Sequence, residues 1–204
     1  MWRMLCLVAA ALARAGCGAV GGSAGVDADS TLLLGAPPAG VHAGIYLAVE
    51  RGFDEAEGIN LTIRRSGDAG QLLGTGQVQA ALLKLDQIRA ARAVCVMALL
   101  QRPAGPYVCV SRTTLEDRRP EVLALVRTLQ RGYSETEADP ESAVQAILTR
   151  APGLDRATLA AQLDAVSGAF EAGAPAFGSL SQTRIPREAR AWFDFSLVGP
   201  VSRD

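Results

Sequence analysis

The sequence predicts an α/β fold, in which one mostly parallel sheet is flanked by helices and further C-terminal helices pack on it. Three observations support this prediction. A strand, a helix and a second strand follow one another between residues 32 and 63. Two later apolar runs, VQAALLK from residue 78 and VCVMALL from residue 94, have the length of buried strands. Beyond residue 119 the apolar residues recur at helical spacing.

The strand–helix–strand pattern over residues 32–63 is supported by several local signals. The apolar run from Leu32 to Leu34 stops at Gly35 and a Pro-Pro pair, which predicts a short buried strand and a tight loop. An alternation of apolar and polar residues from Ile59 to Ile63 predicts the second strand. Between them, one helical stripe ends at Gly52: Val41, Ile45, Ala48 and Val49. Such a βαβ unit has parallel strands and a right-handed crossover.

The later elements follow from local signals at their starts. Asp68, with Gln71 three residues on, predicts a capping box for a short helix over 68–73. Asp86 is the expected N-cap of a helix that leads into a strand over 94–100. The strand that begins at Tyr107 is followed by three helices. Pro120 suits the first turn of the first helix, Asp139 is the expected N-cap of the second, and Asp155 opens the third.

Composition limits the classes of function. With 204 residues, 49% of them hydrophobic, the chain can bury a core without a metal or disulfide scaffold. Its formal net charge is -1, which does not favour nucleic acid as a partner. We expect no metal site, because no Cys or His spacing suits one.

The N-terminus has the pattern of an export signal. Arg3 precedes an apolar run from Leu5 to Leu12, and small residues then lead to Cys17. We expect residues 1–17 to be a bacterial lipoprotein signal that ends at a lipidated Cys17. Ordinary secretion with a different cleavage point is the alternative. Residues 18–30, rich in Gly, Ala and Ser, then form a flexible tether.

Two cysteines, Cys95 and Cys109, lie within the predicted strands. An oxidising exported setting would permit a bridge between them. The sequence does not fix their distance, so the favoured interpretation is two separate buried thiols that pack as small hydrophobic side chains.

Residues 42–59 resemble a known family. The matching positions are His42, Gly44, Tyr46, Ala48, Glu50, Gly52, Phe53, Gly58 and Ile59. The pattern is similar to the substrate-binding proteins of ABC transporters, in the group similar to thiamine-pyrimidine synthases. The resemblance implies a type II periplasmic-binding-protein fold, a periplasmic or membrane-anchored location, a permease subunit as partner and a small heterocycle as ligand.

The chain departs from these relatives near residue 103. There the relatives cross into a second α/β lobe and return, whereas here a Pro-Ala-Gly-Pro turn leads directly to Tyr107. We therefore expect a single ligand-binding lobe over residues 31–198. It is made of an N-terminal part, 31–103, and a return strand with C-terminal helices, 107–198.

Ligands in open α/β sheets bind beyond the carboxyl ends of the strands. The residues expected to contact a ligand there are Pro37, His42, Tyr46, Gly67, Asp68, Asp86 and Gln101. For His42 the alternative is a helix-start histidine satisfied by solvent or backbone. For Tyr46 the alternative is a core aromatic.

Lys84 bears on whether the chain is an enzyme. The resembling synthases carry a lysine in this loop that forms a Schiff base with pyridoxal phosphate, but Lys84 is displaced by one position. We expect a solvated lysine, no catalytic residue and no cofactor. Two alternatives stay open, a synthase-like enzyme and a degenerate remnant without function.

Overall fold

The computed structural model of the protein describes residues 28–102 and 105–198. Its sheet has the order β2-β1-β3-β5-β4. The strands are β1 (Ala28–Leu34), β2 (Ile59–Arg65), β3 (Ala80–Leu83), β4 (Ala93–Ala98) and β5 (Tyr107–Ser111). β1 pairs in parallel with β2 and β3, whereas β5 is antiparallel to both β3 and β4. Four strands thus point one way and β5 points the other, which confirms the predicted mostly parallel sheet.

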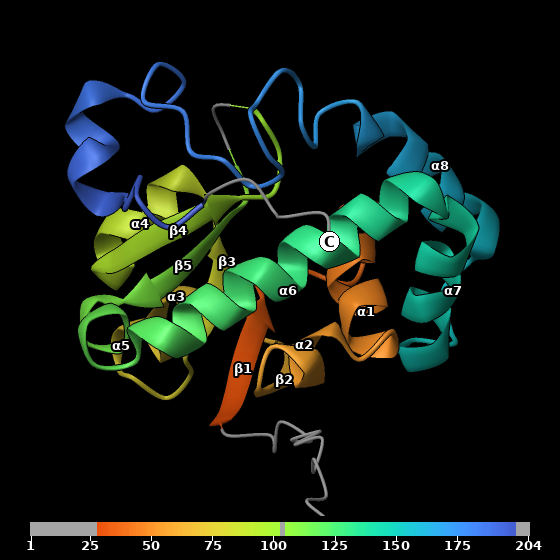
Figure 1. The fold of residues 1–204 in the computed structure, drawn as a ribbon, viewed down its shortest axis with the longest axis horizontal. Coiled ribbons are helices and arrows are strands. Elements are labelled where there is room, and N and C mark those ends of the chain that lie inside the picture. The colour runs from red at the N-terminus through yellow and green to blue at the C-terminus, as the bar shows by residue number, and fades with distance from the viewer. Residues whose placement is uncertain (1–27, 103–104, 199–204) are drawn as a thin grey trace, which may run out of the picture.

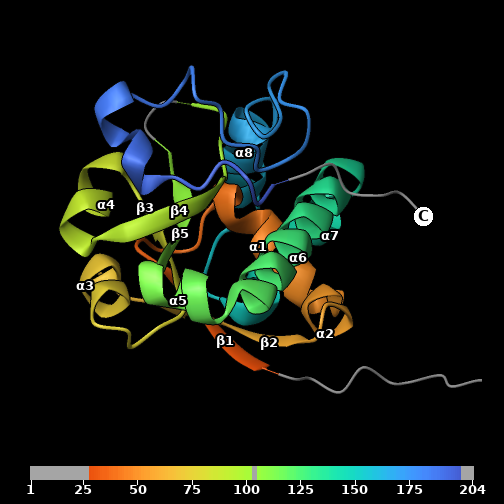
Figure 2. The ribbon, with the colours of Figure 1, turned by 60° about the vertical axis from the view of Figure 1, so that its left-hand side comes forward.

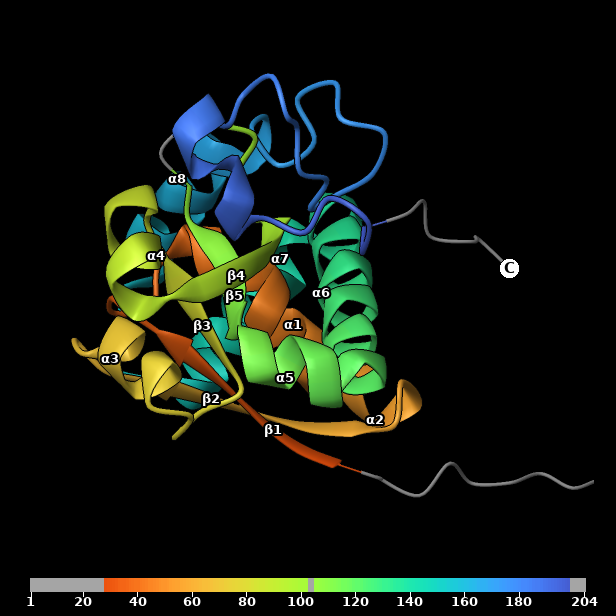
Figure 3. The same ribbon diagram turned by 90° about the vertical axis from the view of Figure 1, so that its left-hand side faces the viewer.

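Helices cover both faces of this sheet (Figure 1). Their bounds are η1 (Gly40–His42), α1 (Ala43–Glu50), α2 (Phe53–Ala56), α3 (Ala69–Gly74), α4 (Leu85–Ala91), α5 (Arg112–Asp117), α6 (Arg119–Ala138), α7 (Pro140–Arg150), α8 (Arg156–Ser167) and η2 (Arg187–Trp192). Figures 2 and 3 show α3 and α4 on one side of the sheet, with α1, α6 and α7 on the other. Within the described residues, no helix is both long and apolar enough to cross a membrane.

The two layers of helices bury two separate cores, and β1 contributes to both. Leu32 and Leu34 pack on the side of α1 and α6, whereas Leu33 packs on the side of α3 and α4. Because successive side chains of a strand point to opposite faces, a strand buried on both faces needs a continuous apolar run. The Leu-Leu-Leu sequence meets this need.

Both edges of the sheet are covered. At the β2 edge, an Asp54 carboxylate oxygen on α2 accepts a hydrogen bond from the Leu61 N–H at 2.9 Å. At the β4 edge, Phe193 forms a parallel bridge with Cys95, and the Asp194 N–H donates to the Cys95 carbonyl at 2.9 Å. Covered edges leave fewer free backbone groups to pair with another chain.

The start of the fold corrects one predicted boundary. Residues 28–30 belong to β1, where they pair with residues 59–61 of β2, so they are not part of a tether. The Asn60 side-chain amide also donates to the Asp29 carboxylate at 2.9 Å. Composition alone suggested a flexible segment, but pairing with β2 orders these residues. The predicted signal over 1–17, Cys17 and the rest of the tether lie outside the described residues.

Predicted helix caps are right in the C-terminal part and wrong near the sheet. Asp139 accepts from the Ser142 N–H at 3.0 Å and Asp155 from the Thr158 N–H at 2.7 Å, as predicted. Asp68 does stand at the N-cap of α3, but its side chain makes no capping bond. The N-cap of α4 is Lys84, and Asp86 lies inside the first turn. The Lys84 N–H is satisfied by the Gln87 side chain at 2.9 Å, so α4 begins earlier than predicted.

Cys95 and Cys109 form a disulfide, so the favoured prediction of two separate thiols is wrong. The two residues are register partners on the antiparallel strands β4 and β5. That register, which places both side chains on one face, depends on how the hairpin closes. Just beyond the paired strands, the Leu99 N–H donates to the Pro106 carbonyl at 2.9 Å. β4 and β5 are therefore direct neighbours, in keeping with a single lobe.

Reduction of the disulfide should destabilise the fold. The bond closes a short loop, with a sequence separation of 14, so its loss should lower the free energy of unfolding by about 3 kcal/mol. Urea unfolding with and without a phosphine reductant measures this difference. The double variant Cys95→Ala/Cys109→Ala is the control and should not respond to the reductant. Identical midpoints for the oxidised and reduced native chain would show that the bond contributes nothing.

Candidate functional site

The carboxyl ends of β1, β2, β3 and β4 lie together at one end of the sheet, because these four strands point the same way. The described segments that follow them are residues 35–39, residues 66–68, Lys84, and residues 99–102 with 105–106. In open α/β sheets, ligands bind beyond the carboxyl ends of the strands. We call these segments, together with η1 and the start of α1, the binding edge.

The segment after β1 is held from two sides. The Tyr133 hydroxyl on α6 donates to the Val41 carbonyl at 2.6 Å, and the Gly40 N–H donates to the Gln162 side chain on α8 at 3.1 Å. A Cβ on Gly40 would collide with the backbone of α8 at Leu163. This position therefore requires glycine, and the contacts fix where α1 begins.

α1 is fixed in turn by its crossing with α6. Gly44 of α1 faces the ring of Tyr133, and Gly132 of α6 faces the Gly44 carbonyl and Ala48. A Cβ at either glycine would overlap these atoms. Two glycines thus let the helix backbones approach closely.

His42 is buried, with 5% of its surface exposed. Its Nδ1 accepts a hydrogen bond from the Ala39 N–H at 3.1 Å, so the proton of the neutral ring is on Nε2. Burial lowers the pKa of His42 to about 4. The ring is therefore neutral near pH 7, closes the turn before α1, and retains the Nε2–H as its donor. This geometry matches the alternative of a histidine satisfied by backbone.

Tyr46 is also buried, with 6% of its surface exposed. Burial raises the pKa of Tyr46, and the positive charges of Arg150 and Arg65 oppose that rise. The sequence interpretation missed these two arginines. Arg65 could have been found, because it continues the alternation of Ile59, Leu61 and Ile63 to the end of the strand and so lies on the α1 face. Arg150, at the end of α7, has no such local signal.

Gln101 is buried among residues of the C-terminal segment. Its side-chain amide donates to the Ser179 carbonyl at 2.9 Å, and its N–H donates to the Ala169 carbonyl at 2.7 Å. Arg184 donates to the Gln101 carbonyl at 2.8 Å. A ligand could use this amide only by replacing these partners.

The remaining candidates are exposed: Pro37, Gly67, Asp68 and Lys84 lie in the binding edge, and Asp86 lies next to it in the first turn of α4. They follow β1, β2 and β3, which are neighbours in the sheet. The segment after β4 is farther away, because β5 lies between β3 and β4 and adjacent strands are about 4.8 Å apart. The topology thus groups five exposed candidates and sets Gln101 apart. Ligand contact at each of them stays a prediction.

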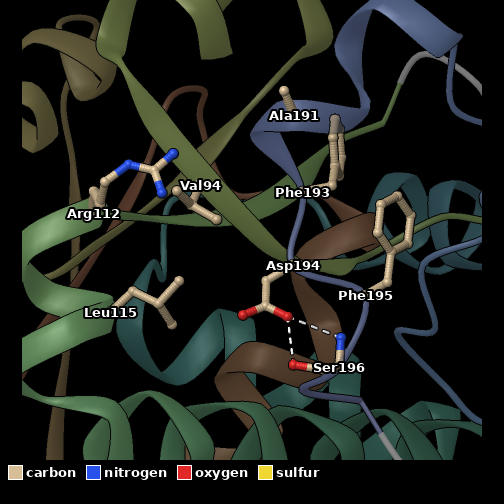
Figure 4. Close-up of a pocket in the computed structure, with 8 residues that line it drawn as sticks. All are labelled: Val94, Arg112, Leu115, Ala191, Phe193, Asp194, Phe195 and Ser196. Atoms are coloured by element: carbon tan, nitrogen blue, oxygen red, sulfur yellow. Dashed lines mark hydrogen bonds between the residues drawn. The ribbon is translucent and has the colours of Figure 1, made fainter.

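An open cavity of about 420 Å³ lies at the opposite end of the sheet (Figure 4). Its wall includes Val94, near the start of β4, and Arg112, which follows the end of β5. Asp194 in this cavity accepts from the N–H and hydroxyl of Ser196 and pairs with Arg119 at 3.5 Å. These contacts hold the C-terminal segment against the sheet, away from the binding edge.

Potential metal ligands do not gather at the binding edge or elsewhere in the described part of the chain. Among residues 28–102 and 105–198, no three His, Cys, Asp or Glu side chains lie close enough together to hold a metal ion. The exposed residues at the binding edge offer a ligand hydrogen-bonding groups and charges of both signs, namely the carboxylate of Asp68 and the ammonium of Lys84.

The His42 geometry predicts a pH dependence. The folded pKa of about 4 lies below the ordinary value of 6.5, so the unfolded chain takes up the proton first. Stability should be highest above pH 6.5 and fall by up to about 3 kcal/mol as the pH drops towards 4. His42→Asn should remove this part of the pH dependence. Unfolding free energies of both proteins between pH 4 and 7 measure it, and parallel curves would contradict the assignment.

The α1–α6 crossing predicts the effect of one added methyl group. Gly132→Ala should destabilise the fold by about 1–3 kcal/mol or more, because the Cβ would overlap the Gly44 carbonyl. Gly168→Ala is the matched control, since no atom lies within 4 Å of its added Cβ. Thermal unfolding of both variants measures the difference. Equal melting temperatures would mean that the helices do not cross this closely.

Comparisons with known proteins agree with this geometry. Residues 39–105 match the model of the NMT1/THI5-like family. A solved structure from Candida albicans, that of the conserved CA3427 gene product, is similar with a TM-score of 0.53 at 9% identity, over 67% of this chain and 78% of that chain. That protein is described as defining a new family with the generic periplasmic binding protein structural fold. None of the curated proteins matches. The chain therefore has the fold of the periplasmic binding proteins, and residues 39–105 resemble the NMT1/THI5-like family.

Proposed function

We propose that this chain is the ligand-binding lobe of an exported substrate-binding protein. One observation carries the proposal. The NMT1/THI5-like match over residues 39–105 covers η1, α1 and the carboxyl ends of β2, β3 and β4, which form most of the binding edge. The matched segment is thus the part of the fold that would meet a ligand. The proposed domain organisation is a single lobe that begins with β1 at residue 28, not at residue 31, and continues to residue 198, without a facing lobe.

The proposed ligand is a small heterocycle, such as a thiamine-precursor pyrimidine. A flat heterocycle carries polar ring atoms, and the exposed side chains of Asp68, Lys84 and Asp86 could supply hydrogen bonds to them. In two-lobed relatives a hinge closes both walls on the ligand. A single lobe provides only one wall, so less of the ligand surface would be buried and the affinity should be lower than in two-lobed relatives.

The proposed setting is the periplasm or the outer face of the cytoplasmic membrane. The Cys95–Cys109 disulfide supports it, because such bonds persist in oxidising compartments. A lipid anchor at Cys17 would hold the lobe at the membrane, next to the permease of an ABC importer. The role of Cys17 rests on the pattern of the N-terminal signal, and the role of the permease rests on the family resemblance.

Binding should be measurable but weak. Ligand-observed NMR titration with a thiamine-precursor pyrimidine should give saturable binding with a Kd weaker than micromolar. Asp68→Ala and Lys84→Ala should each weaken it several-fold. Asp117→Ala, an exposed residue at the end of α5, is the matched control and should leave binding unchanged.

Two results would contradict the proposal. Micromolar or tighter binding by the monomer would show that no facing wall is needed. Absence of saturable binding by any small heterocycle, in a chain that unfolds sharply, would favour the degenerate remnant.

The synthase-like alternative depends on Lys84, which is exposed at the end of β3. An enzyme of that type would form a Schiff base between this lysine and pyridoxal phosphate. We expect no aldimine absorbance band after incubation with pyridoxal phosphate. A band that is present in the native chain and lost in Lys84→Ala would favour the enzyme.

A further inference from the structure

A groove of about 510 Å³ lies between α6, α7 and α8, apart from the binding edge. It exists because α8 packs on α7 and η1 and leaves space towards the end of α6. Its walls are Thr136, Glu137, Pro140, Glu141, Val144, Arg156, Ala160, Leu163, Asp164, Ser167 and Phe170. The volume is in the range of small-molecule sites.

The inner part of the groove is apolar and rigid. Val144 and Leu163 are buried, and Phe170 closes the inner end with none of its surface exposed. The Phe170 ring packs edge-on against Tyr133, with 5.0 Å between centroids. Tyr133 in turn stacks on Phe177 at 4.0 Å. This aromatic cluster fixes the wall against which an apolar body would pack.

The rim of the groove carries an excess of negative charge. Glu137, Glu141 and Asp164 line it, against one cation, Arg156. The Arg156 guanidinium already donates to the side chain of Gln145. Burial raises the pKa of Glu137, and the nearby negative charge of Glu171 raises it further. A bound cation would relieve this repulsion.

We propose that this groove binds a small organic cation with an apolar body, of the size of a benzylammonium ion. The apolar body would occupy the space between Val144, Leu163 and Phe170. The positive head would lie among the three carboxylates at the rim. An anion of the same shape would meet repulsion there, and a neutral one would gain only the apolar contact. The proposal does not depend on the proposed function, because no residue of the binding edge lines the groove.

The first test compares three probes of similar shape: benzylammonium, benzyl alcohol and phenylacetate. Ligand-observed NMR titration should show saturable binding of benzylammonium. Benzyl alcohol should bind at least about tenfold more weakly, and phenylacetate should not bind. Equal binding of the three probes would overturn the proposal. A complete lack of benzylammonium binding would also overturn it.

The second test locates the site with matched variants on α8. Ala160→Leu narrows the groove and should abolish benzylammonium binding, whereas Ala161→Leu, an exposed neighbour outside the groove, should not change it. Glu137→Gln/Asp164→Asn should weaken binding at least about tenfold, with Glu188→Gln on η2 as the control. All variants must keep the native unfolding transition. Equal benzylammonium binding by both leucine variants would overturn the assignment. A dimer of the native chain in sedimentation velocity that dissociates in Ala160→Leu would also overturn it, because a second copy of the chain would then occupy the groove.

Discussion

The close crossing of α1 and α6 at Gly44 and Gly132 is the contact on which the rest of the binding edge depends. It brings Tyr133 against the start of α1, where its hydroxyl bonds to the Val41 carbonyl. The buried Tyr133 ring also stacks on Phe177, from the C-terminal segment. One aromatic residue thus connects the segment after β1, the long helix α6 and the end of the fold. Larger residues at the two glycines would separate these parts.

The α1–α6 crossing also explains why His42 is buried and neutral. With η1 held between α6 and α8, His42 is enclosed and neutral, and its Nδ1 closes the turn at Ala39. At the other side of the sheet, the Cys95–Cys109 bond and the Phe193 bridge hold the β4–β5 hairpin. The proposed ligand contacts at the ends of β1, β2 and β3 are exposed polar residues that lie between these two fixed regions.

Local patterns were enough to predict the βαβ unit and the C-terminal helices. Asp139 and Asp155 cap their helices because the bond spans only three residues, which sequence can show. The pairing of Cys95 with Cys109 could not be predicted, since it depends on hairpin register. The environment of Tyr46 also depends on the fold, because Arg150 comes from α7, which is distant from Tyr46 in the sequence. The groove beside α8 depends on how α6, α7 and α8 pack together, and no local sequence pattern predicts that packing.

Chemical-shift mapping tests the central claim, that the carboxyl edge of the sheet is the ligand wall, most directly. Backbone amide spectra of an isotope-labelled chain would be followed as a thiamine-precursor pyrimidine is added. The largest chemical-shift changes should lie at residues 35–42, 66–68 and 84–86, which surround the ends of β1, β2 and β3. Changes confined to the opposite end of the sheet, around Arg112 and Asp194, would contradict it.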